Sequence, residues 1–161
     1  MRPDGLLRTG FVVPLDLRSV LTQDPPFVAA ARFCLVAEID STDDVAGLQS
    51  LHRFLTGAGH DYRALGKGIV TDTAALSSLL GDDNYFTGFD EIWLFREEPA
   101  AAKPEELSLT TVPLAWTKFK LAAEWMAETN CIVGLGDGDG LAWVTNEAAV
   151  AGWISSLEDS P

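Results

Sequence analysis

The chain has 161 residues, of which 47% are hydrophobic and 22% charged, so it can bury the core of one globular domain, expected to span residues 1–161. Its 24 acidic and 11 basic residues give a net charge of −13. Both nucleic acids and anionic lipids are bound through clustered Lys and Arg, so this charge excludes the first kind of partner and disfavours the second. Residues 81–161 hold 15 of the acids and 4 of the bases, which predicts an acidic face.

The N-terminal half alternates predicted strands and helices. Pro14 interrupts the first apolar run and predicts an edge strand or a bulge, and a turn follows at residues 24–26. Ser41 and Asp44 have the spacing of a capping box, and apolar residues at helical spacing follow them. The elements predicted here are strands at 11–17, 32–39 and 68–71, and helices at 41–56 and 73–80.

The C-terminal half contains the most regular patterns of the chain. A continuous apolar run at 92–95 predicts a strand covered on both faces. Asp137 and Gly138 begin an Asp-Gly-Asp-Gly turn between two apolar runs, the strongest short signal for a hairpin. The elements predicted here are strands at 92–95, 107–112, 131–136 and 141–145, a helix at 113–128, and a final helix with Val150, Trp153, Ile154 and Leu157 on its apolar face.

Together these elements predict one α+β domain. Its mostly antiparallel or mixed sheet would carry three to four packed helices, and the chain would end in a β-hairpin followed by a helix. Cys34 and Cys131 lie in apolar runs and are expected to be free buried thiols. No signal-peptide pattern and no membrane-spanning run is visible, so we expect a cytoplasmic protein.

The helix at 113–128 has two apolar stripes beside a polar face. Ala115, Phe119, Ala122, Ala123 and Met126 form one stripe, Leu114, Leu121 and Trp125 form the other, and Thr117, Lys120, Glu124 and Glu128 form the polar face. Burial on two sides explains this pattern. A homo-oligomer that uses Leu114, Leu121 and Trp125 as its interface is the alternative.

Two glycine-containing loops resemble ligand sites without meeting their requirements. A calcium loop that includes Gly140 would place Leu135 and Asn146 at ligand positions that need carboxylates. A phosphate loop ending at Gly66-Lys67-Gly68 would need glycine where Asp61 stands. We therefore expect neither a metal ion nor a nucleotide cofactor.

A catalytic role depends on few residues. His52 lies on the edge of an apolar helix face, whereas His60 lies in a glycine-flanked loop beside Asp61, so His60 and Asp61 are the candidate catalytic residues. Neighbouring carboxylates at 82–83 and 90–91 could run acid–base chemistry or hold Mg²⁺. A small carboxylate-dependent enzyme that uses His60 is thus the alternative function.

The stretch at 82–91 is more typical of a recognition surface. Aromatic side chains bordered by acids form the composition of an interface with a basic partner, although the aromatics could instead close the end of the sheet. The leading hypothesis is a non-catalytic, acidic interaction domain that docks on a basic protein, in the manner of a neutralising or adaptor protein. The expected binding residues are Asp82, Asp83, Tyr85, Phe86, Asp90 and Glu91, with Asp137 and Asp139 as a second acidic patch.

Overall fold

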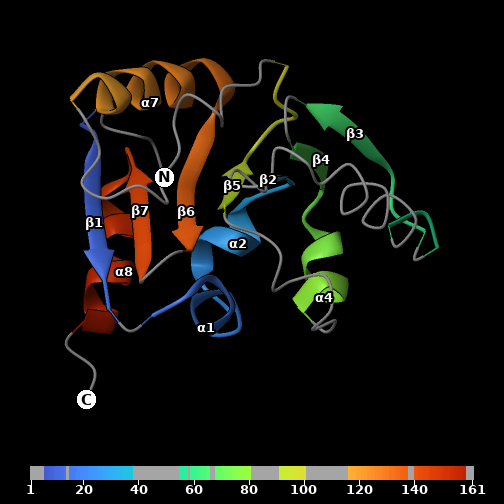
Figure 1. Ribbon diagram of the computed structural model, residues 1–161, viewed down its shortest axis with the longest axis horizontal. Helices are drawn as coiled ribbons and strands as arrows, with labels where there is room; N and C mark the ends of the chain where they lie inside the picture. Colours follow the sequence, from blue (N-terminus) through green and yellow to red (C-terminus); the bar gives the residue numbers. More distant parts are fainter. Residues whose placement is uncertain are drawn as a thin grey trace.

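One antiparallel sheet organises the molecule (Figure 1). The computed structural model describes residues 6–13, 15–37, 55–57, 59–65, 68–80, 91–100, 116–137 and 140–158. Within these residues seven strands pair in the order β1-β7-β6-β5-β2-β4-β3, and every neighbouring pair is antiparallel. The strands are β1 (Arg8–Val12), β2 (Phe33–Ala37), β3 (Tyr62–Leu65), β4 (Gly68–Asp72), β5 (Glu91–Phe95), β6 (Cys131–Asp137) and β7 (Leu141–Thr145).

Helices cover both faces of this sheet. The described helices are α1 (Leu17–Leu21), α2 (Pro26–Ala30), α4 (Ala74–Leu80), α7 (Trp116–Thr129) and α8 (Ala148–Glu158). Residues of α1, α2, α4 and α8 share one hydrophobic cluster, whereas α7 contributes to a second cluster on the other face. In Figure 1, α7 crosses one end of the strands at the top of the view.

The fold class expected from the sequence is wrong. The sheet is antiparallel between all described neighbours rather than mixed, and the chain is a sheet-rich fold with short helices, not three to four packed helices over a mixed sheet. Part of the error comes from the N-terminal segment, where a strand was expected at 11–17. The strand instead ends at Val12, and Asp16 caps a helix by accepting a hydrogen bond from the backbone N–H of Ser19 at 2.7 Å.

Two further short elements differ from the sequence-based expectation. The proline pair that was interpreted as a turn begins α2, with Pro26 at its first position, where no backbone donor is needed. The glycine-flanked segment after His60 forms the edge strand β3, which pairs with β4. The predicted helix at 41–56 lies mostly outside the described residues, and the predicted strand at 107–112 lies entirely outside them.

Strand β5 is at the centre of the fold and is buried along its whole length. It pairs with β2 on one side and β6 on the other. Its side chains alternate between the faces: Ile92 and Leu94 join the cluster under α8, whereas Trp93 and Phe95 join the cluster under α7. This double burial explains why the strand is a continuous apolar run.

Helix α7 is held on its face of the sheet by aromatic packing. Trp125 is fully buried, and its ring meets those of Trp93 and Phe95 edge to face, with centroids 5.0 and 5.4 Å apart. Within the described residues, no helix is long and apolar enough to cross a membrane.

Candidate functional site

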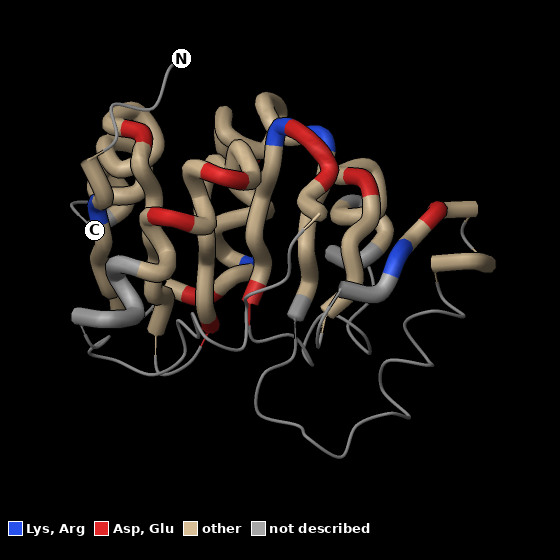
Figure 2. Tube along the Cα trace, turned by 90° about the horizontal axis from the view of Figure 1, so that it is seen from above, with Lys and Arg blue, Asp and Glu red and all other residues tan. Residues whose placement is uncertain are grey.

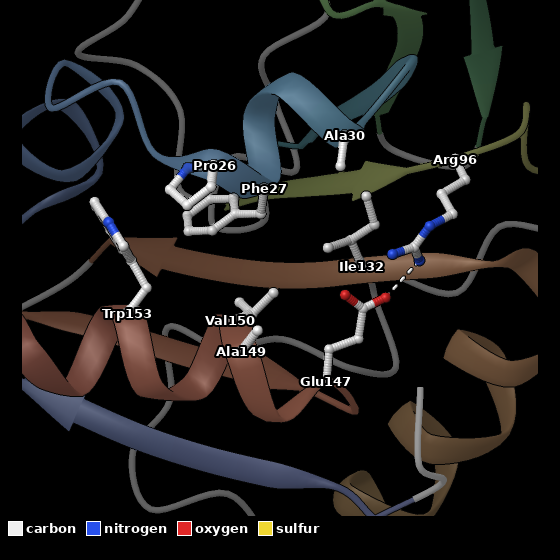
Figure 3. A pocket seen from close by; sticks show the side chains of 9 residues that line it. All are labelled: Pro26, Phe27, Ala30, Arg96, Ile132, Glu147, Ala149, Val150 and Trp153. Atoms are coloured by element: carbon white, nitrogen blue, oxygen red, sulfur yellow. Dashed lines mark ion pairs between the residues drawn. The ribbon is translucent and has the colours of Figure 1, made fainter. Parts of the chain in front are cut away.

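A pocket of about 170 Å³ lies between α2 and α8, above β6 (Figure 3). Helix α2 forms one wall, helix α8 the opposite wall, and Ile132 of β6 the floor. Figure 3 shows one charged end of the pocket, where Arg96 and Glu147 face each other. The lining residues are Pro26, Phe27, Ala30, Arg96, Ile132, Glu147, Ala149, Val150 and Trp153.

The two charged residues reach the pocket from the ends of two strands. Arg96 directly follows β5, and its backbone N–H donates to the carbonyl of Asn130 at 3.1 Å. Glu147 follows β7, and its backbone N–H donates to Oγ1 of Thr145, which itself donates to the carbonyl of Ile132 at 2.6 Å. These bonds fix the backbone on both sides of the charged pair.

The charged pair is unequally buried. Nη1 of Arg96 lies 2.5 Å from Oε1 of Glu147, and the two side chains are 31% and 4% exposed. Oε1 is buried and makes this contact without hydrogen-bond geometry, so within the described residues it has an ion-pair partner but no hydrogen-bond donor. Figure 3 shows the second oxygen, Oε2, turned away from Arg96, on the pocket side. A buried carboxylate normally accepts several hydrogen bonds, so this one is under-satisfied.

The rest of the pocket is apolar. Phe27 and Trp153 meet edge to face at the end of the pocket away from the ion pair, with ring centroids 5.4 Å apart and planes at 87° (Figure 3). Phe27 is buried, and Trp153 is half-buried at the end of the pocket away from the ion pair. The pocket therefore combines an aromatic wall with one polar end, the usual composition of a ligand site.

A second group of polar side chains surrounds His60. Its Nε2 lies 3.1 Å from Oγ of Ser78, on α4, and its Nδ1 lies 3.7 Å from Oδ1 of Asp72, at the end of β4. The imidazole is 17% exposed. Asp72 also accepts a hydrogen bond at 3.2 Å from the backbone N–H of Ala75 and so caps the start of α4. A hydroxyl, an imidazole and a carboxylate in this order form the arrangement of an activated nucleophile.

The other catalytic candidate, Asp61, does not belong to this group. It is exposed, and its backbone carbonyl accepts a hydrogen bond from Thr71. The structure therefore places a different carboxylate, Asp72, beside His60. No group of three or more His, Cys, Asp or Glu residues that could hold a metal ion exists in the described part of the chain.

Most of the expected binding residues are not described. Asp82, Asp83, Tyr85, Phe86, Asp90 and Asp139 lie outside the described residues. Glu91 is fully buried at the start of β5, where its Oε2 accepts a hydrogen bond from Nε1 of Trp93 at 2.9 Å. Asp137 is half-buried at the end of β6. The Glu91 carboxylate is thus buried against Trp93 and is not exposed on the surface.

The described residues of the expected self-interface are buried or half-buried within the chain itself. Leu114 lies outside the described residues, Leu121 is half-buried against the cluster under α7, and Trp125 is fully buried in that cluster. Leu121 and Trp125 therefore pack toward the chain's own sheet.

Both cysteines are free thiols in the core, as expected. Burial, together with the nearby Asp72 carboxylate, raises the pKa of Cys34 to about 12. Burial also raises the pKa of Cys131. A thiol held protonated in this way is a poor nucleophile, so neither cysteine is a candidate catalytic residue.

The sequence analysis missed the Arg96–Glu147 pair, although a signal for it was present. β5 and β7 are both antiparallel to β6, so their C-terminal ends lie at the same edge of the sheet. Opposite charges stand just past those ends. The pairing could be recognised only once β5 was known to be the neighbour of β6.

No protein-family model matches this chain, and it matches neither a curated protein nor a solved structure.

Proposed function

We propose that this chain is a non-catalytic interaction domain that docks on a basic protein partner. The observation that carries this proposal is the excess of acidic over basic residues, which gives a net charge of −13. The chain's own ion pairs also occupy some of its few basic side chains. Arg63 and Arg96, two of the few cations, are held by the chain's own Glu98 and Glu147 at 2.8 and 2.5 Å. Arg63 also donates to the carbonyl of Pro99. Figure 2 shows more Asp and Glu than Lys and Arg along the described trace.

Three exposed acids lie near one end of the sheet, and we call them the acidic corner: Glu97, Glu124 and Glu128. Asn130, which follows α7, donates through Nδ2 to Oε2 of Glu97 at 3.3 Å. This bond joins the end of α7 to the segment after β5. Glu124 and Glu128 are one turn apart on α7, so they face the same side of the helix.

The two acids of the acidic corner that belong to α7, Glu124 and Glu128, lower the stability of that helix. Glu124 and Glu128, four residues apart, repel each other, and Glu128 lies in the last turn, where an acid opposes the helix dipole. Lys120, four residues before Glu124, has the spacing to offset part of this repulsion. The last turn of α7 holds no basic residue that would offset them. Residues that break a local stability rule are expected at functional sites, which supports a binding role for Glu124 and Glu128.

An acidic surface of this kind would act mainly on the rate of association. Complementary charge steers a basic partner during diffusion and rejects other acidic proteins, whereas it adds less to the affinity of the final complex. Asp82, Asp83, Tyr85, Phe86 and Asp90, which lie outside the described residues, are proposed as further binding residues for the basic partner.

The test compares two double variants of equal charge change. A basic protein captured from source-cell lysate at low salt is purified, and its association rate is measured with the wild type, with Glu124→Gln/Glu128→Gln, and with Asp24→Asn/Asp61→Asn. Asp24 and Asp61 are exposed acids outside the acidic corner. We expect about a tenfold slower association for the first variant at low salt and a much smaller change for the second.

Equal rates for all three proteins at low salt would overturn the role of the acidic corner. Failure to retain any basic protein at low salt would overturn the proposed function itself.

The group around His60 supports a second candidate, a hydrolase that uses Ser78 as its nucleophile. The supporting observation is that His60 contacts both the Ser78 hydroxyl and the Asp72 carboxylate. In such a reaction, Nε2 of His60 would take the hydroxyl proton and Asp72 would stabilise the imidazolium.

An alkyl fluorophosphonate tests this candidate. Oγ of Ser78 would form a bond to phosphorus, fluoride would leave, and the proton would pass to His60. Mass spectrometry should find the label on Ser78 in the wild type and not in His60→Gln, while the exposed Ser156, whose Oγ donates to a backbone carbonyl, serves as the internal control. Equal labelling of Ser78 and Ser156 would exclude an activated serine.

A further inference from the structure

The pocket between α2 and α8 contains the carboxylate of Glu147, a hydrogen-bond acceptor that is incompletely satisfied by the described residues. Glu147 is 3% exposed, and among the described residues its buried Oε1 has no hydrogen-bond donor. Oε1 is in contact with Arg96, and Oε2 is turned toward the apolar space between the helices (Figure 3). A carboxylate oxygen that faces an apolar pocket can accept a hydrogen bond from a ligand that brings a donor.

The charge at this end of the pocket selects for a neutral ligand. Arg96 already compensates Glu147 at 2.5 Å, so the pair as a whole carries no net charge. A cationic ligand would bring a second positive charge close to Arg96, and an anionic ligand would meet the carboxylate. Either would also lose its own hydration in a mostly apolar space, which is costly for an ion.

The volume of the pocket favours a ligand no larger than a small aromatic molecule. Its volume of about 170 Å³ is close to that of an engineered cavity of ~150 Å³ that binds benzene, and it is below the ~300 Å³ at which sites for drug-sized ligands begin. Phe27 and Trp153 offer ring edges and faces, and Val150 and Ile132 offer aliphatic contacts. An aromatic ring packs well against such walls.

We propose that this pocket binds a small, neutral aromatic molecule with one hydrogen-bond donor, of the phenol or indole class. The ring lies between α2 and α8, and the donor reaches Oε2 of Glu147. This site is separate from the acidic corner and does not depend on the proposed docking function.

The test is a titration of the full-length protein with phenol and with toluene, which has the same shape but carries a methyl group in place of the hydroxyl. Backbone amide shifts of residues 27–30 and 147–150 are followed by NMR. We expect saturable shifts in both segments and at least tenfold tighter binding of phenol. Equal binding of the two ligands would overturn the role of Glu147, and absence of saturable shifts with phenol would overturn the site.

Two alanine substitutions separate the pocket from the surface around it. Ala149 lines the pocket, and its neighbour Ala148 does not, while both are exposed on the first turn of α8. Ala149→Leu should reduce phenol binding at least tenfold by filling the space, and Ala148→Leu should leave it unchanged. Because both positions are exposed, both variants should fold; an unaffected Ala149→Leu would place the ligand elsewhere.

Benzylamine and benzoate test the charge argument. They carry a positive and a negative charge on the same ring, and both should bind more weakly than phenol. Tighter binding of either ion than of phenol would overturn the assignment to neutral ligands.

Discussion

Two glycines of the sheet stand directly opposite tryptophans on neighbouring strands. Gly134 pairs with Trp93, and Gly10 pairs with Trp143. A Cβ at Gly134 would lie 2.4 Å from the Trp93 ring, and a Cβ at Gly10 would lie 2.3 Å from the Trp143 ring. In each pair the missing side chain makes room for an indole that covers the neighbouring strand.

The Gly134–Trp93 contact predicts a large effect of one methyl group. Trp93 cannot move aside easily, because it is fully buried, donates to Glu91 and packs against Trp125. Gly134→Ala should therefore lower the free energy of unfolding by about 2–3 kcal/mol, the cost typical of overpacking a dense core. Urea denaturation followed by circular dichroism measures this change.

Gly152 provides the matched control. It is an exposed residue within α8, and a Cβ there would meet no atom within 4 Å. Gly152→Ala should raise the free energy of unfolding by about 0.5–1 kcal/mol, because alanine loses less conformational freedom in a helix. If both substitutions change stability by the same amount and sign, the packing explanation for Gly134 is wrong.

The two thiols predict how stability depends on alkaline pH. The folded protein raises the pKa of Cys34 from 9.0 to about 12, and it also raises that of Cys131. Between these values the unfolded chain loses protons that the folded chain keeps. Stability is therefore unaffected by the thiols below about pH 9 and falls above it by about 1.4 kcal/mol per pH unit for each thiol.

Unfolding free energies of the wild type and of Cys34→Ala/Cys131→Ala, measured from pH 8 to pH 11, test this prediction. The double variant should lose less stability with rising pH than the wild type, although both share the titration of the remaining groups. Parallel pH profiles would show that the thiols ionise equally in the folded and unfolded chains.

At the scale of an element, α7 combines strong burial with an unfavourable end. Its inner face carries Trp125 and Met126 in the core, which stabilises the helix through packing. Its outer face carries Glu124 and Glu128, which repel each other, and Glu128 lies in the last turn, near the negative end of the helix dipole. Packing against the sheet therefore stabilises the helix, whereas its exposed acids destabilise it.

Neutralising these acids should stabilise the protein. Glu124→Gln/Glu128→Gln is expected to raise the free energy of unfolding by about 0.5 kcal/mol at low salt, and the gain should shrink as salt screens the charges. Denaturant unfolding at two salt concentrations measures it. A loss of stability in this variant would mean that the two carboxylates make favourable contacts, and the case for their functional role would fall.

At the scale of the whole molecule, the net charge of −13 acts against compactness. Added sodium chloride shortens the screening length from ~10 Å at 0.1 M to ~3 Å at 1 M, so it weakens repulsion among the acids. We expect the thermal midpoint to rise over this range of salt. Glycerol, which does not screen charge, serves as a comparison, and a midpoint that falls with salt would contradict the prediction.

The sequence predicted those elements whose stability is local or whose burial is complete. The apolar run of β5, the Asp-Gly hairpin that joins β6 and β7, and the periodic helices α7 and α8 lie close to the expected positions. Helices α1 and α2 have only five residues each, and β3 has four. Elements this short do not span enough residues to show a periodic pattern of apolar side chains. Their position and type therefore depend on tertiary packing.

The residues that line the candidate pocket also divide into those that the sequence predicted and those that only the tertiary structure brings together. Val150 and Trp153 were expected on the apolar face of the last helix, and both line the pocket. Arg96 and Glu147 are 51 positions apart in the chain, and nothing in their own neighbourhoods predicts that they meet. Their contact depends on the strand order β7-β6-β5, which brings two strand ends to the same edge.

The sequence by itself determined the charge of this protein, its apolar periodicity and the buried state of its cysteines, because these depend on composition and on neighbours along the chain. Only the tertiary structure decided the strand order, the burial of Glu91, and the pairing of His60 with Asp72 and Ser78. Those features depend on contacts between distant segments. Many alternative pairings of antiparallel strands satisfy the same local pattern, and the packing of the whole core selects one of them.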